Sequence, residues 1–246
     1  MAETGHRRLL TFGGAYSNHL RATAAAGRLL GLRTVGVVRG EELADRPLNP
    51  SLARCAEDGM LLHFVPRSAY RRRADPAFHD ALRARFGACT VVPEGGSNAA
   101  AVRGCALLGE ELRGHTDIAA VACGTGGTLA GMAAGLSPAQ RSIGVAVLKG
   151  GFLGGEVRRL QREAFGGPRG HWRMEERLHE GGYARTSARL ADFAADFAQR
   201  HALPALETTY VAKLLLALTH LTDEGAFPRG STVTAVVTGQ PWTGES

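Results

Sequence analysis

A chain of 246 residues, 44% hydrophobic and 21% charged, can bury the core of one large or two small globular domains, which argues against a disordered chain. Its formal charge of +6 comes almost entirely from arginine, because Lys149 and Lys213 are the only lysines. The basic residues are spread along the chain with few aromatic residues among them, so we expect no nucleic-acid partner.

Short β-branched and aliphatic runs alternate with amphipathic stretches of helical length. The pattern predicts strands at Leu9–Phe12, Thr34–Val38, Leu61–Val65, Thr90–Val92, Ile118–Ala122, Ile143–Leu148 and Val233–Thr238. It predicts helices at about Asn18–Leu30, Pro50–Asp58, Pro76–Phe86, Asn98–Leu112, Thr128–Gly135, Glu156–Phe165, Ser187–Arg200 and Tyr210–Glu224. Parallel strands need a crossover connection, which a helix usually supplies, so the alternation predicts an α/β fold with mostly parallel sheets.

The best candidate for a domain boundary is the turn Pro93–Ser97, where a predicted strand ends and Ser97 can cap the next helix. We therefore expect a smaller α/β lobe of three to four strands at residues 1–96 and a larger lobe at residues 97–246. Parallel sheets bind ligands at the carboxyl ends of their strands, so the loops at those ends are the places to look for function.

Nothing in the sequence indicates a membrane span, a secretory signal or a metal site. The apolar stretch Ile118–Leu136 is interrupted by glycines and threonines, and Met1–Leu10 has no apolar segment of the kind that signal peptides carry. The four cysteines are far apart in the sequence: Cys55, Cys89, Cys105 and Cys123. We expect a cytoplasmic protein without disulfides, without a bound metal and without a membrane partner.

The loop between a predicted strand and a predicted helix at Cys123–Thr128 is rich in glycine. Gly124, Gly126 and Gly127 let a ligand approach the backbone, and the start of a helix offers N–H groups to an anion such as a phosphate. Thr125 and Thr128 add hydroxyl groups. The alternative is a tight turn that binds nothing.

A second strand end runs into a helix at Phe12–His19. Ser17, Asn18 and His19 supply a hydroxyl, an amide and an imidazole at the helix start, an arrangement that suits an anionic substrate group. The alternative is that Ser17 or Asn18 only caps the helix and that His19 is an exposed residue of its first turn.

Two further candidates lie near the C-terminus. Tyr210, at the entrance of a predicted helix, could act as an acid, a base or a stacking surface, or could be an ordinary amphipathic tyrosine. Thr238 ends the last predicted strand, and a threonine at such a place is common.

Taken together and in this order, these elements resemble the family of aminocyclopropane-carboxylate deaminases and D-cysteine desulfhydrases, which use pyridoxal 5'-phosphate (PLP). The resemblance covers nearly the whole chain and extends through Pro93–Asn98, Val147–Gly151, Gly181–Ala184 and Phe227–Ser231. It implies a two-lobed, three-layer fold of the tryptophan-synthase-β type, a homodimer, and a small amino acid as the substrate.

The resemblance also implies roles for the candidate residues. Gly124, Thr125, Gly126, Gly127 and Thr128 correspond to the loop that holds the PLP phosphate. Asn18 corresponds to an asparagine that contacts the ring hydroxyl, and Thr238 to a threonine near the pyridine nitrogen. Ser17, Asn18 and His19 would bind the substrate, with Ser17 and the active-site tyrosine, Tyr210, as the catalytic residues.

Departures from the family pattern favour the desulfhydrase reading. True deaminases usually have glutamine where this chain has His19 and glutamate where it has Val211. Tyr16 and Gln240 also differ from common family residues, so the resemblance does not fix the substrate.

The family lysine that carries PLP would fall upstream of Met1. Lys149 and Lys213 correspond to other family positions, at a strand end and on a helix surface, so we expect a chain shortened at its start. Two hypotheses stay open. In one, the complete protein eliminates sulfide from D-cysteine to give a keto acid and ammonia. In the other, the protein is a degenerate member that only binds PLP or phosphate, or serves as an interaction module.

Overall fold

The computed structural model describes residues 5–239, and the chain divides into two compact units, Met1–Gly96 and Ser97–Ser246. Each unit is built around its own four-stranded sheet and is described here by itself. Every strand pairing in the two sheets is parallel, so the predicted α/β fold with parallel sheets is confirmed.

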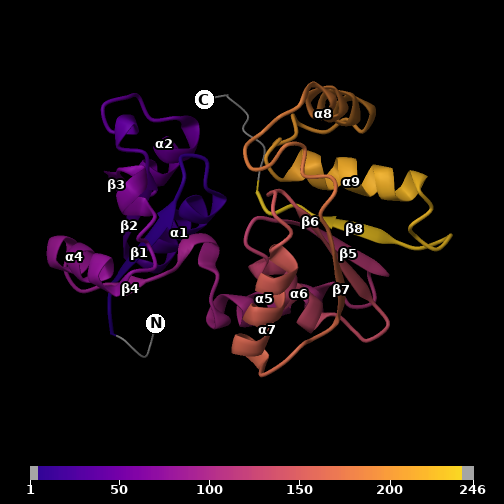
Figure 1. Ribbon diagram of the computed structural model, residues 1–246, viewed down its shortest axis with the longest axis horizontal. Coiled ribbons are helices and arrows are strands. Elements are labelled where there is room, and N and C mark those ends of the chain that lie inside the picture. The colour runs from indigo at the N-terminus through magenta and orange to yellow at the C-terminus, as the bar shows by residue number, and fades with distance from the viewer. Residues whose placement is uncertain (1–4, 240–246) are drawn as a thin grey trace. The chain divides into compact units, whose positions relative to one another are not determined.

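The sheet of the first unit has the strand order β3-β2-β1-β4 (Figure 1). Its strands are β1 Arg8–Gly13, β2 Arg33–Arg39, β3 Met60–Val65 and β4 Thr90–Val91. Its helices are α1 Asn18–Leu30, α2 Pro50–Glu57, α3 Arg67–Tyr70 and α4 Pro76–Phe86, with short 3-10 turns η1 Glu41–Leu43 and η2 Glu94–Gly96.

Helices cover both faces of this sheet. Phe12 of β1 packs with Tyr70 and Leu82, which come from α3 and α4. On the other face, Leu20 of α1 and Cys55 of α2 form a second buried cluster with residues of β2 and β3. The result is a three-layer unit whose central strands, β1 and β2, are almost entirely buried.

The sheet of the second unit has the order β7-β6-β5-β8 (Figure 1). Its strands are β5 Ile118–Cys123, β6 Arg141–Ala146, β7 His171–Glu175 and β8 Val233–Val236. Its helices are α5 Ala99–Glu111, α6 Gly127–Gly135, α7 Leu153–Phe165, α8 Ala188–Arg200 and α9 Val211–Asp223.

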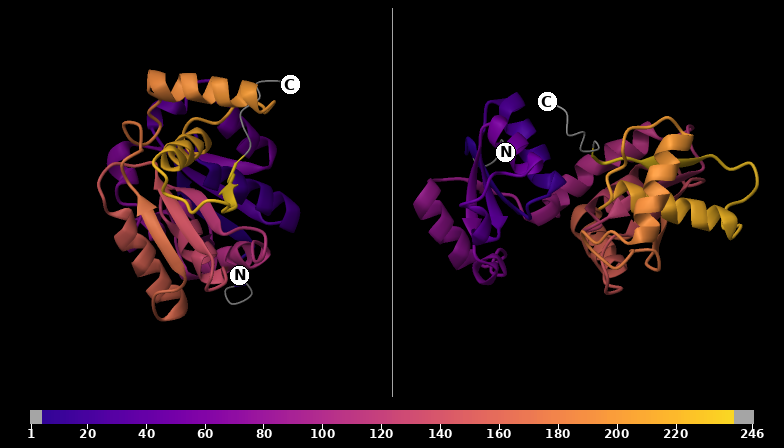
Figure 2. Two further views of the ribbon diagram at one scale, coloured as in Figure 1. Left: turned by 90° about the vertical axis from the view of Figure 1, so that its right-hand side faces the viewer. Right: turned by 90° about the horizontal axis from the view of Figure 1, so that it is seen from above.

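The second unit is also layered. Helices α5, α6 and α7 cover one face, where Val121 of β5 packs with Leu129 of α6 and Val157 of α7. Helix α9 covers the other face through Leu214. Helix α8 packs on α9, on the side that faces away from the sheet (Figure 2). Because β5 is a central strand buried on both faces, the loop that follows it at Gly124 starts from a rigid position.

The prediction missed one strand and misplaced the ends of two others. β7 was not predicted, because His171–Glu175 is short, lies at a sheet edge and has only Trp172 and Met174 as apolar residues among polar ones. β6 begins at Arg141 and ends at Ala146, two residues earlier at both ends than expected. β8 ends at Val236, so Thr238 follows the strand instead of ending it.

Within residues 5–239, none of the helices combines the length and the apolar character that a membrane span requires.

Candidate functional site

The glycine loop follows β5 and leads directly into α6. Gly126 is the N-cap of α6 and has a left-handed backbone, with φ of 81°. A Cβ at this position would lie 2.7 Å from Cγ2 of Val157, so both the backbone and the packing require glycine. A Cβ at Gly127 would have no atom within 4 Å. The loop therefore presents backbone to open space at the carboxyl end of β5.

The start of α6 differs from the other helix starts of this unit. Asn98 and Ser187 cap α5 and α8 with their side chains, and α7 carries Glu156 in its first turn. Glu207 accepts hydrogen bonds from backbone N–H groups at the start of α9. α6 has neither a capping side chain nor an acidic residue in its first turn. Its N–H groups and positive dipole end are therefore available to an anion.

The polar side chains of the glycine loop and of the strand end before it are largely buried or bonded locally. The hydroxyl of Thr128 forms a hydrogen bond with the thiol of Cys105. Burial raises the pKa of Cys105, and the contact with Thr128 opposes that shift. Burial raises the pKa of Cys123, which ends β5, to about 12, so this thiol is neutral and is not a nucleophile. Thr125 is half-buried.

Tyr210 lies against the glycine loop, although the two are distant in the sequence. A Cβ at Gly124 would lie 3.4 Å from Cε1 and 3.5 Å from the hydroxyl oxygen of Tyr210. Tyr210 immediately precedes α9, and its backbone N–H donates to Glu207 Oε2 at 2.7 Å. The ring of Tyr183 meets that of Tyr210 edge-on, with centroids 6.1 Å apart and planes at 71°. The structure thus brings a pair of tyrosines to the loop.

Thr238 lies two residues beyond β8 and is exposed. β8 pairs with β5, and the last pair is Val121 with Val236. Thr238 therefore lies at the same, carboxyl-terminal end of the strands as the glycine loop. Gln240, which the sequence singled out as a departure from the family, is outside the described residues.

In the first unit, Ser17 is the N-cap of α1. Its Oγ accepts a hydrogen bond from the backbone N–H of Leu20 at 3.3 Å. Gly13, at the end of β1, makes room for this side chain, because a Cβ there would lie 2.7 Å from Ser17 Oγ. Asn18 is the first residue of α1 and is half-buried. The capping alternative is therefore realised for Ser17, whose hydroxyl proton can still be donated.

His19 is held by a buried threonine that the sequence did not point to. Nε2 of His19 lies 2.7 Å from Oγ1 of Thr11, and this hydroxyl donates to the carbonyl oxygen of Val92 at 2.9 Å. Since the hydroxyl has a single proton, Nε2 must be the donor to Thr11. Burial lowers the pKa of His19, and the negative charge of Glu94 opposes that shift. The imidazole is therefore a neutral ring with Nδ1 as its acceptor.

One expectation from the sequence is wrong. Lys213 was assigned to a helix surface, but its side chain is fully buried on α9. The pattern of this helix could have indicated it, because seven of its residues, apolar apart from Lys213, are buried. Lys149 follows β6 and is exposed, as a residue beyond a strand end can be.

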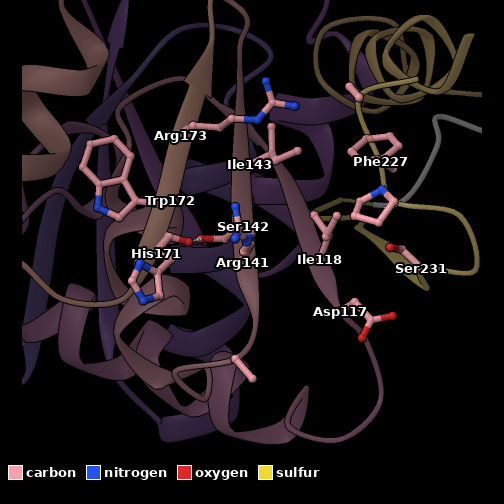
Figure 3. Close-up of a pocket in the computed structure, with 13 residues that line it drawn as sticks. Asp117, Ile118, Arg141, Ser142, Ile143, His171, Trp172, Arg173, Phe227 and Ser231 are labelled. Atoms are coloured by element: carbon pink, nitrogen blue, oxygen red, sulfur yellow. Dashed lines mark hydrogen bonds between the residues drawn. The ribbon is translucent and has the colours of Figure 1, made fainter. Parts of the chain in front are cut away.

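A cavity of about 610 Å³ lies elsewhere on the second unit. Its lining includes Ile118, Arg141 and His171, the first residues of β5, β6 and β7, so it opens at the amino ends of the strands. The side chains of Arg173 and Phe227 also border it (Figure 3). The glycine loop is at the opposite ends of these strands, so this cavity is separate from the predicted chemistry. Among residues 5–239, no three His, Cys, Asp or Glu side chains gather as metal ligands.

Comparisons with known proteins agree with this arrangement. The family described as "Pyridoxal-phosphate dependent enzyme" matches residues 2–239. A Thermotoga maritima protein provisionally named 1-aminocyclopropane-1-carboxylate deaminase is 35% identical over 141 residues, which cover 54% of this chain and 44% of that protein. An Arabidopsis thaliana protein named bifunctional D-cysteine desulfhydrase/1-aminocyclopropane-1-carboxylate deaminase, mitochondrial, is 30% identical over 143 residues, covering 52% of this chain and 36% of that protein.

A solved structure described as an ACC deaminase homologue has the same fold, with a TM-score of 0.81. It is 24% identical in sequence, and the match covers 97% of this chain and 75% of that one. The two curated relatives are matched over less than half of their own length.

Proposed function

Because this chain belongs to the family of pyridoxal-phosphate-dependent enzymes, we propose that the whole protein is a lyase that acts on a small amino acid. The reaction is a D-cysteine-desulfhydrase-like β-elimination, in which D-cysteine and water give a keto acid, ammonia and sulfide. The names of both curated relatives include 1-aminocyclopropane-1-carboxylate deaminase, and one also includes D-cysteine desulfhydrase, which supports this class of substrate.

One observation carries the proposal: the uncapped start of α6 behind an open glycine loop. A phosphate accepts several backbone hydrogen bonds and favours the positive end of a helix, and α6 has no side chain that competes for either. The open space next to Gly127 and the left-handed backbone of Gly126 fit a close approach of the ligand. The residues present therefore fit the phosphate of PLP.

The residues proposed to hold PLP are Gly124–Thr128 for the phosphate, Asn18 for the ring hydroxyl and Thr238 for the pyridine nitrogen. When bound, PLP supplies an electron sink that makes removal of the α-proton and loss of a β-substituent possible. A threonine hydroxyl, unlike a carboxylate, protonates the ring nitrogen only weakly, which suits an elimination from a small amino acid.

The remaining residues bind the substrate and move protons. Ser17 donates its hydroxyl proton to the substrate carboxylate while its oxygen caps α1. His19 offers Nδ1 as an acceptor, because Nε2 is committed to Thr11. In this proposal Tyr210, whose phenol lies beside the glycine loop, donates a proton to the leaving group.

The test uses the product of the complete reading frame, called the full-length protein, and, in parallel, the chain of 246 residues. Sulfide and keto acid are measured with D-cysteine, and ammonia is measured with 1-aminocyclopropane-1-carboxylate. PLP binding is followed by quenching of tryptophan fluorescence, with Gly127→Ala as the variant that alters the loop. We expect sulfide release by the full-length protein and saturable PLP binding that the Gly127→Ala change weakens.

Two results would contradict the proposal. Sulfide release that is as fast in the Tyr210→Phe variant as in the unchanged protein would remove Tyr210 from the chemistry. If the full-length protein binds PLP but turns over neither substrate, the alternative is favoured, in which the protein is a degenerate family member that only binds PLP. Borohydride reduction followed by peptide mass mapping then identifies which lysine, if any, the cofactor joins.

A further inference from the structure

The buried Lys213 is one of only two lysines in the chain. Its side chain has no exposed surface, and it lies on α9 one turn after Tyr210. Burying an ammonium group is costly unless partners compensate for the lost hydration. A lysine at this position therefore needs partners that compensate for its lost hydration.

Lys213 ties α9 to the loop that precedes α8. Its Nζ donates a hydrogen bond of 2.6 Å to the carbonyl oxygen of Gly182. Burial lowers the pKa of Lys213, and the carboxylates of Glu180 and Glu207 oppose that shift. Glu180 belongs to the tied loop, and Glu207 is the carboxylate that accepts from the backbone N–H of Tyr210. The lysine thus joins the loop and the start of α9 by hydrogen bonding and by charge.

The tied loop carries the tyrosine that contacts Tyr210. Gly182 has φ of 111°, a backbone that residues with side chains rarely adopt, and Tyr183 follows it directly. The edge-on contact of Tyr183 places its ring against Tyr210, and Tyr210 in turn lies against Gly124. A continuous series of contacts therefore runs from Lys213 through Gly182 and the two tyrosines to the glycine loop, all inside the second unit.

We propose that Lys213 is a positioning residue that holds Tyr183 and Tyr210 against the glycine loop. It is not the amine that joins the cofactor, since its Nζ is buried and bonded to Gly182. The inference rests on the proposed function only for its effect on PLP. Its effect on the tyrosines follows from the contacts alone.

The first experiment replaces the ammonium group by an apolar chain of similar length, Lys213→Met. The chain has four tyrosines, of which Tyr16 and Tyr70 belong to the first unit. With ring-13C-labelled tyrosine, we expect the NMR signals of Tyr183 and Tyr210 to shift and those of the other two to stay. PLP affinity should fall about tenfold, a size typical of coupled neighbours in one network. The matched control is Arg162→Met, which removes an exposed cation of α7 in the same unit and should change neither the tyrosine signals nor the PLP affinity.

A second pair of variants separates positioning from general stability. Lys213→Gln keeps a donor for the Gly182 carbonyl and should recover part of the PLP affinity. Tyr183→Leu, at a half-buried position, removes the ring that Lys213 positions. The double variant Tyr183→Leu/Lys213→Met should therefore bind PLP only slightly more weakly than Tyr183→Leu alone. If Lys213→Met does not fold, the tyrosine NMR signals and the PLP affinity are measured on Lys213→Gln and Tyr183→Leu instead.

Three results would overturn the inference: unchanged signals of Tyr183 and Tyr210 in Lys213→Met, fully additive losses of affinity with Tyr183→Leu, or a borohydride-stable PLP adduct on Lys213. A chain that does not bind PLP at all would contradict the proposed function instead, and the tyrosine signals would still test the role of Lys213.

Discussion

Replacing Gly126 by alanine tests the construction of the glycine loop directly. A left-handed backbone costs a residue with a Cβ about 1–2 kcal/mol more than glycine. The added methyl group would also lie 2.7 Å from Cγ2 of the buried Val157, and overpacking of this kind typically costs about 1–3 kcal/mol. The lower entropy of the unfolded alanine chain offsets about 0.4–1 kcal/mol. We expect Gly126→Ala to lose roughly 1–5 kcal/mol of unfolding free energy.

The neighbouring Gly127→Ala is the matched control for stability. Gly127 is the first residue of α6, and its added methyl group would meet no atom within 4 Å. Its stability should stay the same or rise by about 0.4–1 kcal/mol. The same methyl group would occupy the open space beside the loop, so PLP affinity should nevertheless fall.

Urea unfolding followed by tryptophan fluorescence is the appropriate assay, because Trp172 packs against the core cluster of the second unit that contains Val157. A Gly126→Ala variant with the same unfolding midpoint as Gly127→Ala would refute the reasoning about the backbone and Val157. A Gly127→Ala variant that binds PLP as tightly as the unchanged protein would refute the role of the loop.

Three further outcomes follow from single contacts. Glu207→Ala removes the carboxylate that caps α9 and should cost about 1–2 kcal/mol in the same urea assay, whereas Glu207→Asp should cost less. Because burial lowers the pKa of His19 below its ordinary 6.5, the unfolded chain binds more protons as the pH falls through this value. Stability of the first unit, followed by circular dichroism in urea, should therefore decrease below about pH 6.5, and less so in His19→Gln. Cys123, whose pKa burial raises to about 12, should react with iodoacetamide only after unfolding, as peptide mass mapping will show.

Local signals in the sequence were enough to predict much of the fold. The helix Asn18–Leu30 was predicted residue for residue, because Ser17 caps its start and Gly31 ends it with a left-handed backbone. The helix Pro76–Phe86 is bounded in the same way by Asp75 and Gly87. β7 carries a weaker signal that the prediction missed: Trp172 and Met174 alternate with polar residues, but the strand has only five residues and no aliphatic run.

The candidate site could be predicted only in part, for a related reason. The glycine loop and the start of α1 are local features, and short segments of sequence reveal them. The contacts of Tyr210 with Gly124 and with Tyr183 join segments that are far apart in the chain. The apolar residues around Lys213 could have indicated its burial, but its partner, the carbonyl oxygen of Gly182, belongs to a distant segment that the helix pattern does not specify.

The hydrogen bonds around His19 refine the chemical role of the helix start in the first unit. A neutral imidazole that donates through Nε2 to Thr11 has only an acceptor left at Nδ1. An acceptor cannot bind a carboxylate, so in the proposed function the substrate carboxylate is assigned to the hydroxyl proton of Ser17 and to the dipole of α1. A neutral acceptor near neutral pH is instead suited to receive a proton from the substrate. The proposed division of labour, with the anion bound by Ser17 and a proton accepted by His19, thus follows from the single proton of the Thr11 hydroxyl.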